Sequence, residues 1–180
     1  MTLLISDPFI PPLTQSLVQQ LSLKLLAKGL MLSSAESCTG GLIAAACTDL
    51  AGSSQWFERG FVTYSNASKV ELLGVDPSLI AAHGAVSQEV ARAMALGALS
   101  HSAAQVSLSV TGVAGPTGGS ADKPVGCVWF GWGLAGGLEG AREPKGPIFT
   151  SERMDFAGTR QEVRAQTVAH SLTRLLQLLP

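Results

Sequence analysis

The feature that most constrains this chain is a strand-like stretch that runs directly into a glycine-containing turn and a helix. Residues 30–35 are mostly apolar, the run Ala35-Glu36-Ser37-Cys38-Thr39-Gly40-Gly41 follows, and residues 42–50 have the small side chains of a closely packed helix. A helix N-terminus that follows a strand has unpaired N–H groups and partial positive charge, and this combination favours anions. The turn also carries hydroxyl and thiol groups that are possible nucleophiles or hydrogen-bond donors. The same segment equally fits an ordinary helix cap by Ser37 or Thr39.

Strand and helix patterns alternate along the rest of the chain. Strands are expected over residues 30–35, 58–64, 106–110, 125–132 and 148–156, and helices over residues 14–28, 41–50, 66–73, 77–83, 87–100 and 159–179. This alternation favours an α/β fold with helices on both faces of a sheet. Residues 133–147 join two strands without a helix, so part of the sheet is expected to be antiparallel.

Length and composition favour one compact domain. The chain has 180 residues, 46% of them hydrophobic and 14% charged, which favours a large buried core or a buried subunit interface. Residues 1–12 hold three prolines and are expected to form an irregular arm, and residues 13–180 the domain. The net charge of −1 gives no basic surface, so no nucleic-acid partner is expected.

The cysteines and the N-terminal segment bear on the compartment. Cys38, Cys47 and Cys127 are too sparse for a disulfide framework, and no Cys/His cluster has metal-ligand spacing. A reducing, cytoplasmic location is therefore expected. The first residues lack a signal-peptide pattern, and no apolar run approaches the roughly 20 residues of a membrane span, so no membrane partner is expected.

Two glycine-rich segments resemble cofactor motifs only superficially. Residues 131–136 match the dinucleotide pattern G-x-G-x-x-G, but Pro144 and Pro147 forbid the helix that this motif requires. Residues 112–120 do not match a P-loop, although their backbone N–H groups can still form an anion-binding nest. Neither segment predicts an organic cofactor.

A second candidate for chemistry is the segment from Tyr64 to Lys69. A lysine five residues after a tyrosine, across a strand-to-helix turn, can bring ammonium and phenol together. A desolvated lysine can lose its proton near neutral pH, and Ser–Lys pairs are one form of nucleophilic catalysis. The alternative is a solvated helix lysine. Cys38 as sole nucleophile would need a lowered pKa, and Arg160 suits either a phosphate or a surface ion pair.

Several ordered motifs together resemble one known family. They are the run 35–41, Gly52-Ser53-Ser54, residues 62–66 with Lys69, residues 83–87, residues 110–116 and residues 123–126. The chain thus resembles the C-terminal domain of the competence/damage-inducible protein CinA over roughly residues 15–178. The family's fused N-terminal domain is absent from this sequence, so only the activity of the C-terminal domain is expected.

The resemblance implies a three-layer α/β/α fold with a mixed, mostly parallel sheet, in a homo-oligomer. It implies an amidohydrolase of pyridine nucleotide salvage, which hydrolyses the carboxamide of nicotinamide mononucleotide to nicotinate mononucleotide and ammonia without metal or organic cofactor. It places catalytic groups at Ser54, Lys69, Tyr64 and Ser37, and substrate-binding groups at Cys38, Thr39, Gly40, Thr111, Gly112 and Arg160. The family's usual Gly-Asp-Arg reads Gly158-Thr159-Arg160 here.

The residue roles within this set are assigned as follows. Ser54 is the expected nucleophile, Lys69 the base, and Tyr64 the group that relays or positions the proton, while Ser37 is the second candidate nucleophile. Thr111, Gly112 and the N–H groups of residues 38–40 are expected to stabilise the oxyanion or bind substrate, and Arg160 to hold the phosphate. Two alternatives stay open: a catalytically inactive nucleotide-binding regulatory module, and an amidase that depends on Cys38.

Overall fold

The computed structural model describes residues 10–136 and 146–179. In chain order the elements are α1 (Pro12–Ala27), β1 (Leu32–Glu36), α2 (Leu42–Asp49), a 3-10 turn η1 (Ser53–Gln55), β2 (Phe57–Val62), α3 (Asn66–Leu73), α4 (Pro77–His83), α5 (Gln88–Ser100), β3 (Val106–Gly112), β4 (Cys127–Leu134), β5 (Ile148–Asp155) and α6 (Arg160–Leu178). None of the described helices is both long and apolar enough to span a bilayer.

The strands of the described residues form one five-stranded sheet with the order β2-β1-β3-β4-β5. Strands β2, β1 and β3 pair in parallel, and β4 pairs antiparallel with both β3 and β5. Four of these five strands therefore run in the same direction. This confirms the mixed, mostly parallel sheet, including an antiparallel pair on either side of the connection at residues 133–147, of which residues 137–145 lie outside the described residues.

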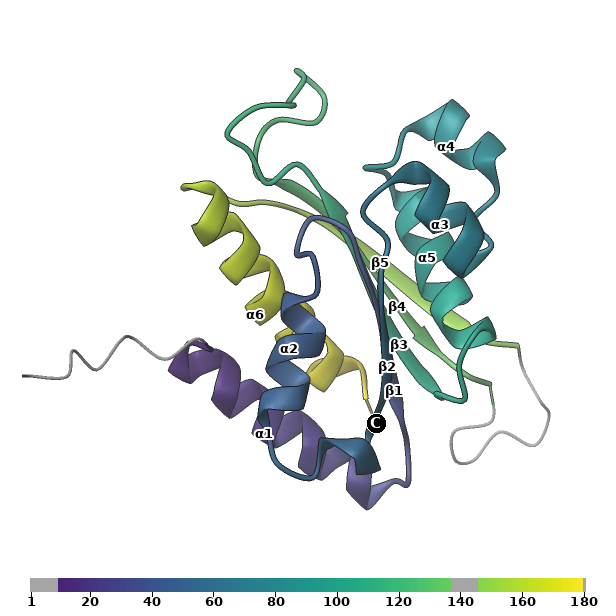
Figure 1. Ribbon diagram of the computed structural model, residues 1–180, viewed down its shortest axis with the longest axis vertical. Helices are drawn as coiled ribbons and strands as arrows, with labels where there is room; N and C mark the ends of the chain where they lie inside the picture. The colour runs from purple at the N-terminus through teal and green to yellow at the C-terminus, as the bar shows by residue number, and fades with distance from the viewer. Residues whose placement is uncertain (1–9, 137–145, 180) are drawn as a thin grey trace, which may run out of the picture.

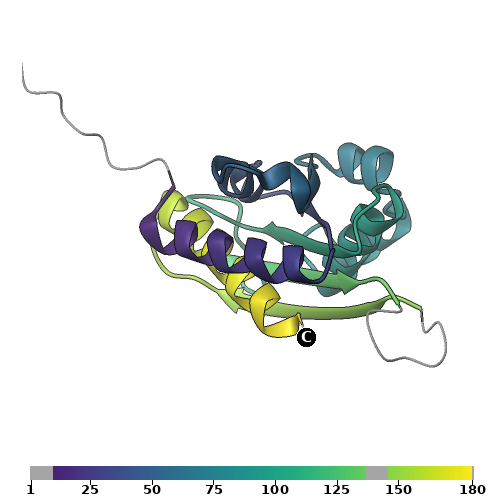
Figure 2. The ribbon, with the colours of Figure 1, turned by 90° about the horizontal axis from the view of Figure 1, so that it is seen from below.

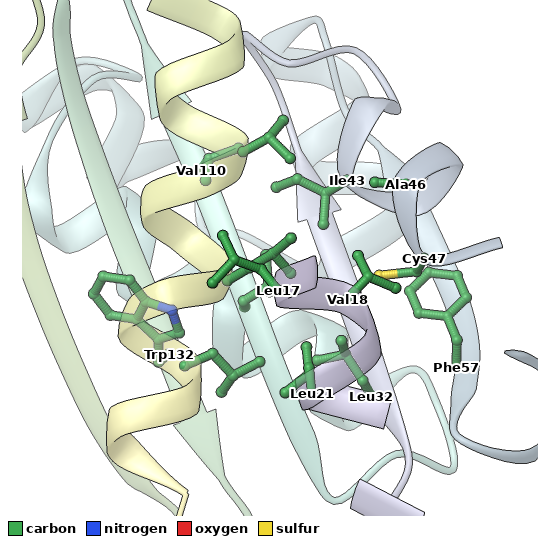
Figure 3. Close-up of a cluster of buried hydrophobic side chains, with 14 of the residues drawn as sticks. Leu17, Val18, Leu21, Leu32, Ile43, Ala46, Cys47, Phe57, Val110 and Trp132 are labelled. Carbon is green, nitrogen blue, oxygen red and sulfur yellow. The ribbon is translucent and has the colours of Figure 1, made fainter. Parts of the chain in front are cut away.

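The helices cover both faces of the sheet, as expected. Figure 1 shows α1, α2 and α6 on one face and α3, α4 and α5 on the other, and Figure 2 shows α1 and α6 side by side. The larger core lies beneath α1, α2 and α6, where Leu21, Ile43 and Trp132 are almost fully buried (Figure 3). The three layers of the expected α/β/α sandwich are all present.

The helix boundaries follow from local capping groups. Ser65, Asp76 and Ser87 each accept a hydrogen bond from a backbone N–H in the first turn of α3, α4 and α5. Gly74, with φ of 65°, ends α3 in the left-handed conformation that glycine adopts without strain. These three helices begin and end within a residue or two of the positions that the sequence predicts.

The strand boundaries depart further from the sequence pattern. Strand β1 begins two residues later than expected and extends to Glu36, and β4 is shifted from 125–132 to 127–134. The shift in β4 has a local cause, because Gly126 has φ of 94° and its Cα lies against the carbonyl of Phe156, where a Cβ would come within 1.9 Å of the oxygen. Residues 131–134 of the G-x-G-x-x-G pattern lie within β4, so both of its first two glycines belong to a strand and not to a strand-to-helix turn.

The proposed N-terminal arm is largely untested. Residues 1–9 lie outside the described residues, and Pro12, expected to be the last residue of the arm, is already the first residue of α1. The division into an arm at 1–12 and one domain at 13–180 stays a prediction.

Candidate active site

The site forms where the parallel strands end. Strand β1 lies between β2 and β3 in the sheet. The connection after β1 leads to β2 on one edge of β1, and the chain then returns to place β3 on its other edge. Ligands in open α/β sheets bind outside the carboxyl ends of the strands at such a point. A cavity of about 210 Å³ lies there, and its lining includes Ser37 after β1, Tyr64 after β2 and Thr111 at the end of β3.

Ser37 and Lys69 meet in this cavity although 32 positions separate them. Lys69 Nζ lies 3.1 Å from Ser37 Oγ, and the Lys69 side chain is 1% exposed. The other neighbours of Nζ are backbone oxygens, at 2.8 Å from Thr63 and 3.5 Å from both Tyr64 and Ser65. Helix α3 projects Lys69 back over its own N-terminus, toward the end of β1.

The surroundings of Lys69 favour its neutral form. Burial lowers the pKa of the Lys69 ammonium, and the neighbouring Cys38 sulfur is a smaller, opposing cause. None of the described hydrogen-bond or ion-pair partners of Nζ is a carboxylate, so no fixed negative charge restores the pKa. A neutral amine 3.1 Å from a serine hydroxyl can accept its proton, which makes this pair suitable for nucleophilic catalysis.

Cys38 lines the same cavity but is a poor nucleophile. Burial raises the pKa of its thiol to about 12, and the smaller lowering effect of nearby backbone N–H groups does not offset it. An amidase that depends on Cys38 would need the opposite shift, because the thiolate is the reactive form. The raised pKa of the thiol therefore argues against the Cys38-dependent alternative.

The anion site expected at the start of α2 is already occupied by the chain itself. Glu36 is fully buried, and its carboxylate accepts hydrogen bonds from the backbone N–H groups of Gly41, Ile43 and Ala44 at 2.8–3.0 Å. The Thr39 hydroxyl donates to the same carboxylate at 2.7 Å. The N-terminus of α2 is thus closed to a substrate anion, and Thr39 acts in this internal network. The Gly40 N–H also points inward, to the Ser37 carbonyl at 3.1 Å.

Two N–H groups of the same turn have no oxygen partner in the described part of the chain. Those of Cys38 and Thr39 lie near the Cys38 sulfur, whose pKa they lower, and donate no hydrogen bond to a described oxygen atom. They belong to the two residues that directly follow Ser37. Of the N–H groups of residues 38–40 that the sequence suggested for the oxyanion, only these two suit that purpose.

Tyr64 and Arg160 form the opposite wall of the cavity. Arg160, the first residue of α6, donates from Nη1 to the Gly115 carbonyl at 2.9 Å and from Nη2 to the Tyr64 hydroxyl at 3.3 Å. The expected contact between the Tyr64 phenol and the Lys69 ammonium is wrong, because Lys69 meets the Tyr64 carbonyl and the phenol turns out toward Arg160. Tyr64 is 63% exposed, so its ring can adjust to a ligand.

The replacement of the family's aspartate by Thr159 leaves Arg160 oriented. Thr159 caps α6 together with Glu162 in a reciprocal capping box. Arg160 is held instead by the two oxygen atoms described above. Among the described residues it forms no ion pair with a carboxylate, so they do not supply the surface ion pair considered for it.

Ser54 lies away from this cavity within the chain. It belongs to η1, which precedes β2, whereas Lys69 follows β2, so the two residues lie beyond opposite ends of that strand. The Ser54 side chain is exposed, and no described contact links it to the cavity. This placement contradicts a Ser54–Lys69 pair within one chain.

Thr111, Gly112 and four residues not expected from the sequence complete the cavity. The Thr111 hydroxyl donates to the Ala85 carbonyl at 2.8 Å and so fixes the wall formed by Ala85 and Val86. A Cβ at Gly112 would come within 2.7 Å of the Cys127 carbonyl, so glycine is required there. The four residues that were missed lie in the motifs at 62–66, 83–87 and 110–116; they are Asn66, Ala85, Val86 and Ala114.

The charges of this cavity suit an anionic ligand. Arg160 is the cation of its wall, Lys69 adds an amine whose pKa is lowered, and no carboxylate of the described residues lines it. Cations in a cleft without compensating acids attract anions. Among the described residues, no group of three His, Cys, Asp or Glu side chains has the arrangement of a metal site.

Comparison with known proteins gives a consistent result. The model of the CinA C-terminal domain family matches residues 14–179. The nicotinamide-nucleotide amidohydrolase PncC of Enterobacter agglomerans is 54% identical over 153 residues, which cover 85% of this chain and 87% of that protein. The protein of the same name from Escherichia coli K12 is 47% identical over 161 residues, 89% of this chain and 92% of that protein.

The fold is also shared with solved structures. The crystal structure of the competence/damage inducible protein CihA from Agrobacterium tumefaciens superposes with a TM-score of 0.86 at 41% identity, covering 95% of this chain and 98% of that one. The three-layer arrangement therefore occurs in experimentally determined relatives.

Proposed function

The chain belongs to the CinA C-terminal domain family, and we propose that it hydrolyses the carboxamide of nicotinamide mononucleotide to nicotinate mononucleotide and ammonia. The observation that carries this proposal is the buried Ser37–Lys69 pair, 3.1 Å apart, in a cavity with Arg160 on its opposite wall. The names of the relatives at 47–54% identity supply the substrate class. The pair supplies a nucleophile and base for amide cleavage, and Arg160 a partner for phosphate.

Ser37 is the nucleophile in this proposal, in place of Ser54. The Ser37 hydroxyl transfers its proton to neutral Lys69 as Oγ bonds to the amide carbon. The backbone N–H groups of Cys38 and Thr39 then stabilise the negative oxygen of the tetrahedral intermediate. Lys69 returns the proton to the departing nitrogen, and ammonia leaves an ester on Ser37.

Water completes the reaction through the same groups. Lys69 accepts a proton from the water molecule that attacks the ester carbon, and then returns it to Ser37 Oγ as the carboxylate leaves. One amide and one water thus give one carboxylic acid and one ammonia, which exchange a proton at neutral pH to give carboxylate and ammonium. Each step uses a residue of this chain, and Lys69 serves alternately as base and acid.

Arg160 explains why a nucleotide is preferred over free nicotinamide. Its guanidinium belongs to the exposed part of the cavity wall and makes no described contact with Ser37, and it can bind the substrate phosphate with N–H groups not used by Gly115 and Tyr64. Binding energy from such a remote group orients the reacting amide. Tyr64 positions Arg160 through its hydroxyl.

The proposal is tested by ammonia release from purified protein. We expect kcat/KM for nicotinamide mononucleotide to exceed that for nicotinamide by a factor of about 100 or more, since remote binding groups contribute several kcal/mol. Equal values for the two compounds would remove Arg160 from substrate binding. No ammonia from either compound would instead favour the inactive nucleotide-binding module.

We also propose a cytoplasmic homo-oligomer. The low charge content and several exposed apolar side chains, among them Val62, Leu72 and Ile148, support burial of surface between copies. Light scattering on the purified protein measures the mass directly, and a mass of one chain at all concentrations would contradict this part of the proposal.

A further inference from the structure

A second and larger cavity is lined by residues of α1, α2 and α6. Figure 1 shows these three helices on one face of the sheet. The volume of this cavity is about 590 Å³, which falls in the range of cavities that hold small organic ligands. Arg160 belongs to the wall of both cavities. Nothing in the proposed reaction uses the larger one.

The walls of this second cavity combine apolar side chains with two cations. Ile10, Leu42, Ala46 and Val168 supply apolar surface, while Arg160 and Arg164 lie one turn apart on α6, and no carboxylate lines the cavity. An apolar cavity with a few convergent polar groups is the usual form of a small-molecule site. The chemistry of these walls suits a ligand with an apolar body and a negative group.

Neither arginine forms an ion pair with a carboxylate of residues 10–136 or 146–179. Arg164 Nη2 donates to the Thr39 carbonyl at 2.7 Å, and its buried Nε meets no hydrogen-bond acceptor among those residues. Within the same part of the chain, Arg160 donates only to uncharged oxygens, at Gly115 and Tyr64. A guanidinium has five N–H donors, so both retain donors for a ligand. Arg164 is half-buried and Arg160 is exposed, so an anion placed between them would chiefly offset the partial burial of the Arg164 charge.

We propose that this cavity binds a nucleoside monophosphate beside the catalytic pocket. The flat base lies against Leu42, Ala46 and Val168, and the phosphate is bound by Arg164 together with Arg160. Arg160 lines both cavities, so its N–H donors that bind the nucleotide are not available to the phosphate of nicotinamide mononucleotide. The bound nucleotide therefore raises the KM for that substrate. This regulatory consequence rests on the proposed function, whereas the binding itself does not.

The test uses calorimetric titration with adenosine monophosphate and a matched pair of variants. Ala165 lines the cavity and is exposed, so Ala165→Trp fills the cavity without removing a core side chain. Gln166→Trp is the control, because Gln166 is the next residue, is also exposed and does not line the cavity. We expect a wild-type Kd below about 1 mM, at least a tenfold weaker Kd for Ala165→Trp, and a change under twofold for Gln166→Trp.

Two simpler probes separate the contributions of charge and ring. Inorganic phosphate lacks the base and adenosine lacks the charge, so each should bind at least tenfold more weakly than adenosine monophosphate. In a parallel assay, adenosine monophosphate should raise the KM for nicotinamide mononucleotide in the wild type and in Gln166→Trp, but not in Ala165→Trp.

Three results would overturn the proposal. Equal binding of adenosine monophosphate to wild type and Ala165→Trp would place the nucleotide in the catalytic pocket. No binding up to several millimolar would show that the larger cavity does not bind a nucleoside monophosphate. A change of oligomeric mass in Ala165→Trp would show that a second copy covers the cavity. An inactive wild-type enzyme would refute the proposed function alone, because the titration requires no turnover.

Discussion

Ser37 and Ser54 both lie in glycine-containing turns, but at opposite ends of neighbouring parallel strands. Ser37 follows the carboxyl end of β1, and Ser54 precedes the amino end of β2. Only the carboxyl end gathers Lys69, Thr111 and Arg160. Parallel strands all end at the same end of the sheet, so residues that directly follow different strands lie close together there. A residue that directly precedes a strand lies at the opposite end.

The two serines also differ in their surroundings. Ser37 is 9% exposed and lies beside a desolvated amine, whereas Ser54 is exposed to solvent. A serine hydroxyl needs an adjacent base to act as a nucleophile at neutral pH. Ser54 lies closer to Lys69 in the sequence, yet Ser37 alone meets it in space.

The strongest test of this comparison is to remove each hydroxyl in turn. Ser37→Ala should lower kcat by roughly 10⁴-fold or more, because loss of a nucleophile removes the covalent route. Ser54→Ala should stay within a few-fold of wild type in the same steady-state ammonia assay. If Ser54→Ala abolished turnover and Ser37→Ala did not, Ser54 would have to reach a site on another copy, and the roles would be exchanged.

Removing the base should have the next largest effect. Lys69→Met keeps the apolar stem and should lower kcat by about 10²–10⁴-fold, the usual contribution of a general acid–base group. Lys123→Met, at a half-buried lysine of the 113–126 loop that donates to the His83 carbonyl and does not line the cavity, is the control and should retain activity. Activity of Lys69→Met close to wild type would return Lys69 to a structural role.

Removing the negative charge of Glu36, at the carboxyl end of β1, should have an intermediate effect on stability and kcat. Glu36→Gln replaces one carboxylate oxygen by an NH₂ group facing backbone N–H donors, so we expect a loss of about 1–3 kcal/mol in unfolding free energy and a lower kcat. Asp76→Asn is the matched control, since Asp76 also caps a helix but is exposed and outside the cavity. In the control, kcat and the free energy of unfolding measured with denaturant should both stay near wild type. Equal losses in the two variants would show that Glu36 stabilises the protein no more than an exposed helix cap does.

The smallest expected effect is on the pH dependence of stability. The folded pKa of Lys69 lies below its unfolded value, so the unfolded chain binds more protons between the two values, and stability rises with pH there. Below the folded pKa, burial of the charged ammonium lowers the free energy of unfolding of the wild type. Lys69→Met carries no charge at this position and does not have this cost. The Tm of Lys69→Met should therefore equal or exceed wild type at pH 7, with the difference shrinking toward pH 10. A difference that grows with pH would mean a raised pKa.

Local features of the fold were predictable because their causes are local. The caps at Ser65, Asp76 and Ser87 and the stop at Gly74 depend on bonds within a few residues. The alternation of Val106 to Val110 correctly predicts a strand, but its serines are not solvated. Ser107 and Ser109 are buried and donate to carbonyls of α5 at 2.8 Å and 2.6 Å, a contact that only the packing of α5 reveals.

The site was predictable as a set of segments but not as a set of contacts. The motifs identified Ser37, Tyr64, Lys69, Thr111 and Arg160, and all five line one cavity. Which serine meets Lys69 depends on strand order and direction, which no local pattern encodes. The role of Glu36 was missed because its hydrogen bonds form only when β1 extends to it and α2 turns back above it.

The carboxylate of Glu36 has a consequence for how substrate preference can change. An open helix N-terminus attracts any small anion through fixed backbone groups. Here that position is filled from within, so phosphate and sulfate ions from the surrounding solution find no binding place next to Ser37. In the proposed reaction, recognition of the substrate phosphate depends instead on the side chain of Arg160, which a single substitution can shorten, move or neutralise. Such a substitution would change the preferred substrate tail while leaving the turn at Ser37 untouched.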